Sequence, residues 1–410
     1  MKRRVVITGM GALTPIGNSA AQTWKAAKAG ECGIAPITRF DTSAHKVKLA
    51  AELKQLNVED YIDKREARKM SRFTQLALIA AREAMAQSAL DMASEDASRC
   101  GVNVSSGIGG LDTIEQEHTR GLAKGFDRVS PFFIPMAISN MAAGVIAIEF
   151  GFHGSCTSVV TACASGANAI GESFRAIRDG YADVMLCGGT EASITPLGIG
   201  GFTAMQALCE SQDPARASIP FDAERSGFVM GEGAGILVLE EYEHAAARGA
   251  VILGEVVGFA ATCDAHHITA PPEDGAGAAA CMTAALRDAD ITPEEIGYIN
   301  AHGTSTPMND RAETAAVRGA FGEHAEKLAM SSTKSMTGHL LGASGAVEAI
   351  LTAYALADGF LPPTVGYRVP DAQCGLDIVP NVGRACEIAY ALSSSLGFGG
   401  HNAALVLRKV

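Results

Sequence analysis

Cys163 is the residue of this sequence best placed for nucleophilic chemistry. It lies between a β-branched run, residues 157–161, and a small-residue helical stretch, residues 164–177. This pattern predicts a strand, a turn at the cysteine and a helix that begins directly after it. Because a helix N-terminus has free N–H groups and partial positive charge, we expect the pKa of the thiol to lie below about 8.5. The alternative is a small cysteine buried in the core.

Two histidines stand in loops that are rich in glycine and hydroxyl groups. His302 lies in the stretch 300–307, after a short apolar run, and His339 ends the stretch 331–339, five residues after Lys334. A histidine at a strand end, followed by glycine and hydroxyls, is typical of a site loop. Each could instead be an ordinary hydrogen-bonded turn residue. A metal site made of the cysteine and both histidines is disfavoured, because no HxxxH or CxxC pair is present.

Strand-like and helical runs alternate along the chain, which favours an α/β fold. Strands are expected at 4–8, 100–104, 184–187, 235–239, 251–259, 296–299 and 403–407, helices at 19–29 and 240–247, one long or two abutting helices within 63–89, and a loop at 10–17. The glycine loop 396–402 precedes the last strand. It lacks the GxGxxG spacing and the strand–loop–helix order of a dinucleotide site.

An internal repeat connects the two parts of the chain. Gly166 and Gly345 lie in Ser-Gly-Ala runs 179 residues apart, and Gly180 and Gly359 have the same separation. Two short matches could arise by chance, but a true repeat would make two related α/β halves. We expect residues 1–250 to carry the cysteine and 251–410 the histidines.

Composition excludes several classes of protein. The 410 residues are 48% hydrophobic and carry a net charge of −12, which argues against nucleic acid as a partner. The ten cysteines are scattered, which suits reduced thiols in the cytoplasm. Residues 129–148 are uncharged but interrupted by Pro131 and Pro135. We expect buried irregular chain and helix there rather than a membrane span.

These motifs together resemble the β-ketoacyl-acyl-carrier-protein synthases, the elongating type II condensing enzymes of bacterial fatty acid synthesis. The resemblance runs nearly end to end and includes Val-Val-Ile-Thr-Gly-Met-Gly at 5–11, Ser-Pro-Phe-Phe at 130–133, Phe-Asp at 221–222 with the run 227–233, and Gly-Phe-Gly-Gly at 397–400. Ser394 is a departure, since many relatives have asparagine there. The resemblance implies a thiolase-like fold, with two duplicated halves in α-β-α-β-α layers, and a homodimer.

The resemblance also implies roles for individual residues. Cys163 matches the nucleophile, and His302 and His339 match the pair that binds the malonyl thioester and promotes loss of its carboxylate. The remaining matches are Lys334 and Glu348 as supporting charges, Thr304 and Thr306 along the phosphopantetheine tunnel, Phe398 as a gate whose backbone N–H faces the oxyanion with that of Cys163, and Ile108 and Phe202 at the acyl pocket.

A basic segment suggests a docking surface. The residues Lys64, Arg65, Arg68, Lys69 and Arg72 recur at near-helical spacing in an acidic chain. We expect residues 64, 68 and 72 to share one helix face. The segment could be a landing patch for an acidic carrier protein, or merely a solvated face.

The implied activity is decarboxylative Claisen condensation. An acyl group held on Cys163 would be extended by malonyl-acyl-carrier-protein to a 3-oxoacyl carrier protein two carbons longer, with no cofactor and no metal. The alternatives are a polyketide ketosynthase, which has the same chemistry, and a non-catalytic subunit like a chain-length factor. Subunits of the latter kind lack the nucleophile, so Cys163 argues against that alternative.

Overall fold

The computed structural model describes residues 2–410, so Met1, the first residue of the expected N-terminal half, lies outside the described residues. A ten-stranded mixed sheet forms the frame, in the order β10-β9-β13-β14-β8-β1-β7-β6-β4-β5. The strands are β1 (Val5–Leu13), β4 (Cys100–Ser105), β5 (Cys156–Thr157), β6 (Val184–Glu191), β7 (Gly233–Glu241), β8 (Gly254–Cys263), β9 (Ile296–Asn300), β10 (Ala329–Ser331), β13 (Tyr390–Gly397) and β14 (His401–Arg408).

The two halves of this sheet have the same strand order. Reading inward from β5 or from β10, each half runs third, second, fourth, fifth and first strand of its own set. The two first strands, β1 and β8, pair antiparallel and join the halves. The predicted strands are present apart from most of the run 157–161, and the matching order agrees with a duplicated α/β unit.

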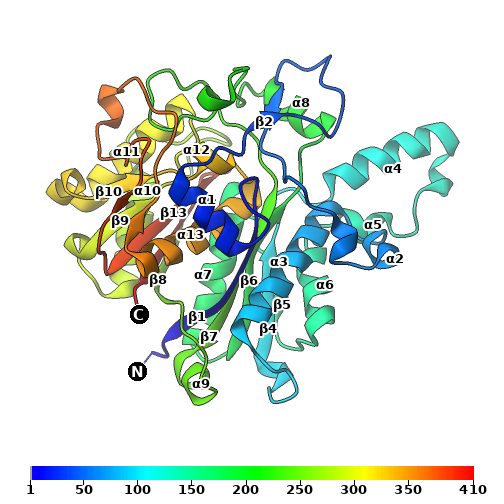
Figure 1. Cartoon of the computed structure of the whole chain (residues 1–410), viewed down its shortest axis with the longest axis horizontal. Coiled ribbons are helices and arrows are strands. Elements are labelled where there is room, and N and C mark those ends of the chain that lie inside the picture. Colours follow the sequence, from blue (N-terminus) through cyan, green and yellow to red (C-terminus); the bar gives the residue numbers. More distant parts are fainter. Residues whose placement is uncertain (1) are drawn as a thin grey trace.

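Helices divide the fold into five layers (Figure 1). Helices α7 (Ser165–Arg178) and α13 (Ser344–Asp358) pack on each other and on strands of both halves. Helices α3 (Arg72–Ser88) and α6 (Met141–Phe150) cover the outer face of the first half. Helix α10 (Ala276–Ala289), with α11 (Pro307–Phe321) beside it, covers that of the second. The expected α-β-α-β-α arrangement is confirmed.

The structure has further α-helices and strands. They are α1 (Ala20–Ala29), β2 (Ala35–Pro36), β3 (Leu49–Ala50), α2 (Lys64–Ala67), α4 (Leu111–Lys124), α5 (Phe133–Ala137), α8 (Pro196–Ala204), α9 (Tyr242–Ala247), α12 (Lys334–Thr337), β11 (Phe360–Leu361) and β12 (Arg384–Ala385). Helix α4 projects away from the body, as Figure 1 shows.

The repeat is visible as a pseudo-twofold contact between α7 and α13. A Cβ on Gly166 would lie 2.9 Å from the backbone nitrogen of Ala346, and one on Gly345 would lie 2.8 Å from that of Ala167. The two glycines thus allow the same close approach from opposite sides. Each helix also follows a 3₁₀ turn, at Ala162–Ala164 and at Leu341–Ala343, and the two turns are again 179 residues apart.

Two local expectations were wrong, and a third was resolved in favour of one of its alternatives. The strand predicted at 157–161 stops at Thr157, because the next backbone N–H groups are satisfied by hydroxyls: Val159 donates to Ser105 and Thr161 to Ser165. The loop predicted at 10–17 begins later, since β1 pairs with β7 through Leu13. The region 63–89, where one long or two abutting helices were expected, forms two helices, α2 and α3, with a break at residues 68–71.

Residues 129–148 are not as buried as expected. They contain α5 and most of α6, but Ile134 is 60% exposed and Ile148 81% exposed. The buried side of α6 is confined to Ala142, Ala143 and Ile146. Among the described residues, no helix combines the length and the apolar character that crossing a membrane requires.

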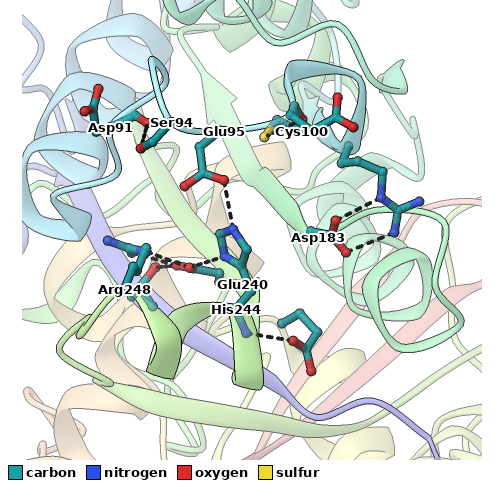
Figure 2. A network of polar contacts seen from close by, with 12 residues as sticks. Asp91, Ser94, Glu95, Cys100, Asp183, Glu240, His244 and Arg248 are labelled. Carbon is teal, nitrogen blue, oxygen red and sulfur yellow. Dashed lines mark hydrogen bonds and ion pairs between the residues drawn. The ribbon is translucent and has the colours of Figure 1, made fainter.

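A polar network fastens α9 and the loop before β4 to the sheet (Figure 2). The ring of His244 lies between two carboxylates, with Nδ1 2.6 Å from Glu240 and Nε2 2.8 Å from Glu95. Arg248 also donates to Glu240, which is fully buried. Hydrogen bonds and charge from the two carboxylates outweigh burial and raise the pKa of His244.

Candidate active site

Cys163 stands in the 3₁₀ turn that leads directly into α7, as the sequence predicted. The preceding Ala162 has a φ of +49°, a backbone conformation that costs energy for a residue with a side chain. The end of β13 presses against this turn, since a Cβ on Gly397 would lie 3.3 Å from the backbone nitrogen of Cys163. The cysteine is 8% exposed and lines a cavity.

The expectation of a lowered thiol pKa was wrong. Burial raises the pKa of Cys163 to about 12, and the charges of Glu191 and Glu348 act in the same direction. The positive charge of Lys334 and the backbone N–H of Phe398 oppose the rise without cancelling it. The resting group is therefore a thiol, because desolvation outweighs these neighbours.

His302 is fixed by the helix that follows its loop. The backbone N–H groups of His302 and Gly303 each donate to the Glu313 carboxylate of α11, both at 2.7 Å. Glu313 is fully buried, and burial raises its pKa to about 7. On the imidazole, Nδ1 lies 3.4 Å from the Lys334 ammonium. An ammonium group can only donate hydrogen bonds, so Nδ1 of His302 accepts and Nε2 carries the proton of the ring.

The imidazole of His339 also accepts a hydrogen bond at Nδ1, but from different partners. Its Nδ1 accepts from the backbone N–H of Leu341 at 3.3 Å and lies 2.9 Å from the Ser344 hydroxyl. The proton of its neutral ring is again assigned to Nε2. Burial and the charge of Lys334 lower the pKa of His302 and His339 well below 6.5. Both rings are therefore neutral hydrogen-bond donors at pH 7.

The two imidazoles lie close together. Their ring centroids are 5.3 Å apart at 88°, and the ring of Phe228 packs edge-on against His339 at 5.1 Å. Behind them, Lys334 forms a buried ion pair with Glu348. Lys334 is thereby held between a carboxylate and the imidazole of His302.

A cavity of about 730 Å³ brings most of the predicted site residues together. Its lining includes Cys163, His302, His339, Thr304, Thr306, Phe202 and Phe398. The hydroxyls of the two threonines are 2.9 Å apart. The aromatic rings are continuous, with Phe202 5.4 Å from Phe228 and 6.3 Å from Phe398. The cavity can hold a long, largely apolar group that ends at the thiol.

Other predicted residues lie outside this lining. Lys334 and Glu348 are behind the histidines, each at most 2% exposed. Ile108 is 37% exposed, in a loop whose Gly107 approaches the carbonyl of Ala162. No group of three or more His, Cys, Asp or Glu side chains in residues 2–410 is arranged to hold a metal ion.

The basic segment is divided by the break between α2 and α3. The expectation that residues 64, 68 and 72 share one helix face was wrong, because Arg72 opens α3 and turns inward to a two-point ion pair with Glu232. Lys64 pairs with Glu59 and Lys69 with Glu66. Within residues 2–410, the exposed side chains Arg65 and Arg68 make no ion pair.

Sequence reasoning missed the carboxylates that hold the site loops. Glu313 binds the backbone at His302, and Asp310 accepts from the backbone N–H groups of Thr304 and Phe221. The available signal was two acidic residues three apart near the start of a helix that follows a site loop. Glu191 gave no local signal, because its partners other than Ser193 are distant in sequence.

Comparison with known proteins agrees with this geometry. Residues 2–245 match the family described as Beta-ketoacyl synthase, N-terminal domain, and residues 253–368 match Beta-ketoacyl synthase, C-terminal domain. The chain is 54% identical over 407 residues to the 3-oxoacyl-[acyl-carrier-protein] synthase 2 of Staphylococcus aureus (strain COL), covering 99% of this chain and 98% of the relative. It is 51% identical over 409 residues to the protein of the same name from Synechocystis sp., covering 100% and 98%.

Solved structures give the same result. A type II PKS ketosynthase in complex with its acyl-carrier protein superimposes with a TM-score of 0.93 at 35% identity, covering 100% of both chains. A beta-ketoacyl synthase from Burkholderia phymatum STM815 superimposes with a TM-score of 0.92 at 35% identity, again over 100% of both. With both family domains matched and near-complete relatives above half identity, the chain belongs to the β-ketoacyl synthase family.

Proposed function

We propose that this chain is a 3-oxoacyl-acyl-carrier-protein synthase that elongates acyl chains by decarboxylative Claisen condensation. One observation carries the proposal: a buried thiol and two neutral imidazoles, both with Nε2–H, line one apolar cavity. The relatives named 3-oxoacyl-[acyl-carrier-protein] synthase 2 support fatty acid elongation. The polyketide alternative is supported by structures at only 35–36% identity.

The first step is thioester exchange on Cys163. The sulfur attacks the carbonyl of the acyl carrier thioester, the carbon–sulfur bond to the carrier breaks, and the thiol proton ends on the departing carrier sulfur. The backbone N–H groups of Cys163 and Phe398 are the proposed donors to the oxyanion, because the end of β13 lies against the cysteine turn.

The second step is loss of carbon dioxide from the malonyl thioester. The bond between the carboxylate and the methylene carbon breaks, and its electron pair forms an enolate whose negative charge develops on the thioester oxygen. We assign His302 and His339 as hydrogen-bond donors to that oxygen. Two neutral imidazole N–H groups can stabilise the developing anion in this way, and neither ring has to lose a proton first. The enolate carbon then attacks the acyl-enzyme carbonyl, and the Cys163 thiolate leaves and takes a proton from solvent.

The surrounding residues are assigned supporting roles. Lys334 and Glu348 hold His302 in the tautomer that donates from Nε2. Thr304 and Thr306 are assigned to the carrier's phosphopantetheine arm, because their hydroxyls stand along the cavity. Phe398 is assigned the gate beside the thiol. Phe202 and Ile108 are assigned to the acyl pocket.

Acyl carrier protein is the proposed partner, in acyl and malonyl forms. One solved relative is described as a ketosynthase in complex with an acyl-carrier protein. The proposed landing patch consists of Lys64, Arg65, Arg68 and Lys69, of which Arg65 and Arg68 are exposed without an ion pair among the described residues. An acidic carrier would be attracted to such cations over about a Debye length.

A homodimer is the proposed assembly. The strand β5 is a sheet edge whose two residues are exposed. Large apolar side chains are also uncovered on the single chain, including Leu122, Phe126, Ile134 and Ile148. A second copy would cover such surface. We further propose that the protein is cytoplasmic, because its scattered cysteines are free thiols. The proposed boundary between the two halves lies at residues 250–251, just before β8.

The test is to separate the two steps. Wild-type protein should extend acyl carrier protein by two carbons and carry one acyl mass on the peptide containing Cys163. Cys163→Ala should carry none. His302→Ala and His339→Ala should both lose decarboxylation of malonyl carrier protein, while at least one still acquires the acyl group. Acylation that survives in Cys163→Ala, or normal decarboxylation in both histidine variants, would show that these assignments are wrong.

A further inference from the structure

Glu191 is a buried carboxylate at the end of β6 for which the proposed reaction has no use. It is fully buried, and its hydrogen bonds go to three segments: residues 106–107, Ser193 and Gly342. Oxygen Oε1 accepts from the hydroxyls of Ser106 and Ser193, at 2.8 and 3.1 Å. Oxygen Oε2 accepts from the backbone N–H groups of Gly107 and Gly342, at 2.8 and 3.1 Å.

These partners belong to the two halves of the chain. Gly107 precedes Ile108 in the loop that approaches the carbonyl of Ala162, one residue before the cysteine. Gly342 follows His339 by three residues, in the turn that leads into α13. A single carboxylate oxygen therefore joins the loop on the acyl side of Cys163 to the backbone that carries a histidine.

The two glycines and the Glu191 carboxylate are closely packed. A Cβ on Gly107 would lie 2.9 Å from Oε2 of Glu191, and one on Gly342 would lie 3.0 Å from it. The Cβ on Gly342 would also lie 2.3 Å from the backbone nitrogen of Gly107. The two segments are in contact, and both N–H groups donate to the same carboxylate oxygen.

We propose that Glu191 is a positioning residue that fixes the spacing between the loop beside Cys163 and the backbone that follows His339; this inference rests on the proposed condensation. Condensation requires the enolate carbon, held at the histidines, to meet the acyl carbonyl, held at the cysteine. An error of about 1 Å in such a placement costs about 100-fold in rate. Thioester exchange and carrier docking do not require the same spacing.

The variants differ in how much of the contact they retain. Glu191→Ala removes it. Glu191→Asp retains the charge but is one methylene shorter, so it cannot reach both segments. Glu191→Gln can retain it, since the amide oxygen can accept from both backbone N–H groups while the amide N–H₂ donates to the two serine hydroxyls. The matched control is Glu83, whose carboxylate accepts from the backbone N–H groups of Ala12 and Ala20, both at 2.9 Å and away from the cavity.

The first measurement is hydrogen–deuterium exchange on peptides that contain Gly107 and Gly342. In Glu191→Ala both peptides should exchange at least about tenfold faster, as expected for loss of a hydrogen bond to a charged group. Glu191→Gln should resemble wild type, and Glu83→Ala should change neither peptide. If only one peptide responds, or neither does, Glu191 does not join the two segments.

The second measurement is steady-state kinetics. Glu191→Ala and Glu191→Asp should lower the condensation kcat by about 100-fold, with KM for malonyl carrier protein within about twofold and with Cys163 still acylated. Glu191→Gln should recover at least tenfold of that loss. A kcat near wild type in Glu191→Ala and Glu191→Asp, or a loss equal to that of Glu83→Ala, would overturn the inference. Absence of condensation in wild type would instead refute the proposed function, and the exchange data would still decide the role of Glu191.

Discussion

The buried ion pair behind the histidines makes a sharp prediction for Lys334→Met. Lys334 is 1% and Glu348 2% exposed, and one Glu348 oxygen, Oε2, has no hydrogen-bond partner in the described residues. Burial raises the pKa of Glu348, and both opposing contributions come from Lys334. Without the lysine only burial remains, so the free energy of unfolding should fall by about 3–5 kcal/mol at pH 7.5.

The pH dependence follows from the sign of that pKa shift. In Lys334→Met the folded state keeps Glu348 protonated above about pH 4.3, where the unfolded chain has released its proton. The folded state then binds more protons, so the stability of the variant falls as pH rises, by at most about 1.4 kcal/mol per pH unit. The deficit relative to wild type should therefore grow between pH 5.5 and pH 7.5.

The assay is urea unfolding of wild type, Lys334→Met and the double variant Lys334→Met with Glu348→Gln. Because the double variant removes both charges of the Lys334–Glu348 pair, it should recover at least half of the stability lost in the single variant. A deficit below about 1 kcal/mol that does not change with pH, or a double variant no more stable than the single one, would refute the reasoning.

Three further predictions address docking, chain length and pH. Reversing charge at Arg68 and Lys69 should raise KM for carrier-bound substrate in a salt-sensitive way and leave reaction with a small thioester nearly unchanged; equal losses on both would indicate misfolding. Ile108→Phe should retain elongation of short acyl chains and lose that of long ones. The measurement is kcat/KM across an acyl series, with malonyl decarboxylation as the control for folding. An equal fall in kcat/KM at every chain length would show that Ile108 does not line the acyl pocket. The pKa of His244 (Figure 2) is raised in the folded state, so its contribution to stability is complete below pH 6.5 and is lost as pH rises through the folded-state pKa. The difference in the free energy of unfolding between wild type and His244→Gln should therefore shrink from pH 6 to pH 9. A difference that does not depend on pH would contradict this.

The sequence predicted those parts of the site that depend on local pattern. Small residues after Cys163 indicated the helix start, and a glycine and hydroxyls after His302 indicated a loop at the end of a strand. The offset of 179 residues predicted two related halves, and the second helix, α13, and the turn before it repeat α7 and its turn at that offset. These signals are short-range, because helix periodicity and turn chemistry are properties of adjacent residues.

The features that could not be predicted depend on partners distant in sequence. The thiol pKa of Cys163 is set by burial under segments from both halves. Arg72 turned inward because Glu232, 160 residues away, lies beneath it. Even the supporting carboxylates that are nearest in sequence bond backbone groups several residues back: Asp310 accepts from Thr304, six residues away, and Glu313 from Gly303 and His302, ten and eleven residues away. In each case tertiary packing decided the outcome, and periodicity carries no information about it.

The duplication itself explains why one half carries the nucleophile and the other does not. The residue equivalent to Cys163, 179 positions later, is Gly342. The two 3₁₀ turns pack against each other, and a Cβ on Gly342 would collide with the backbone of Gly107. A second thiol at this position has no room, so the pseudo-symmetric pair of turns can carry one nucleophile only. The glycine instead donates its N–H to Glu191, a residue of the first half, so this turn supports the half that carries the nucleophile.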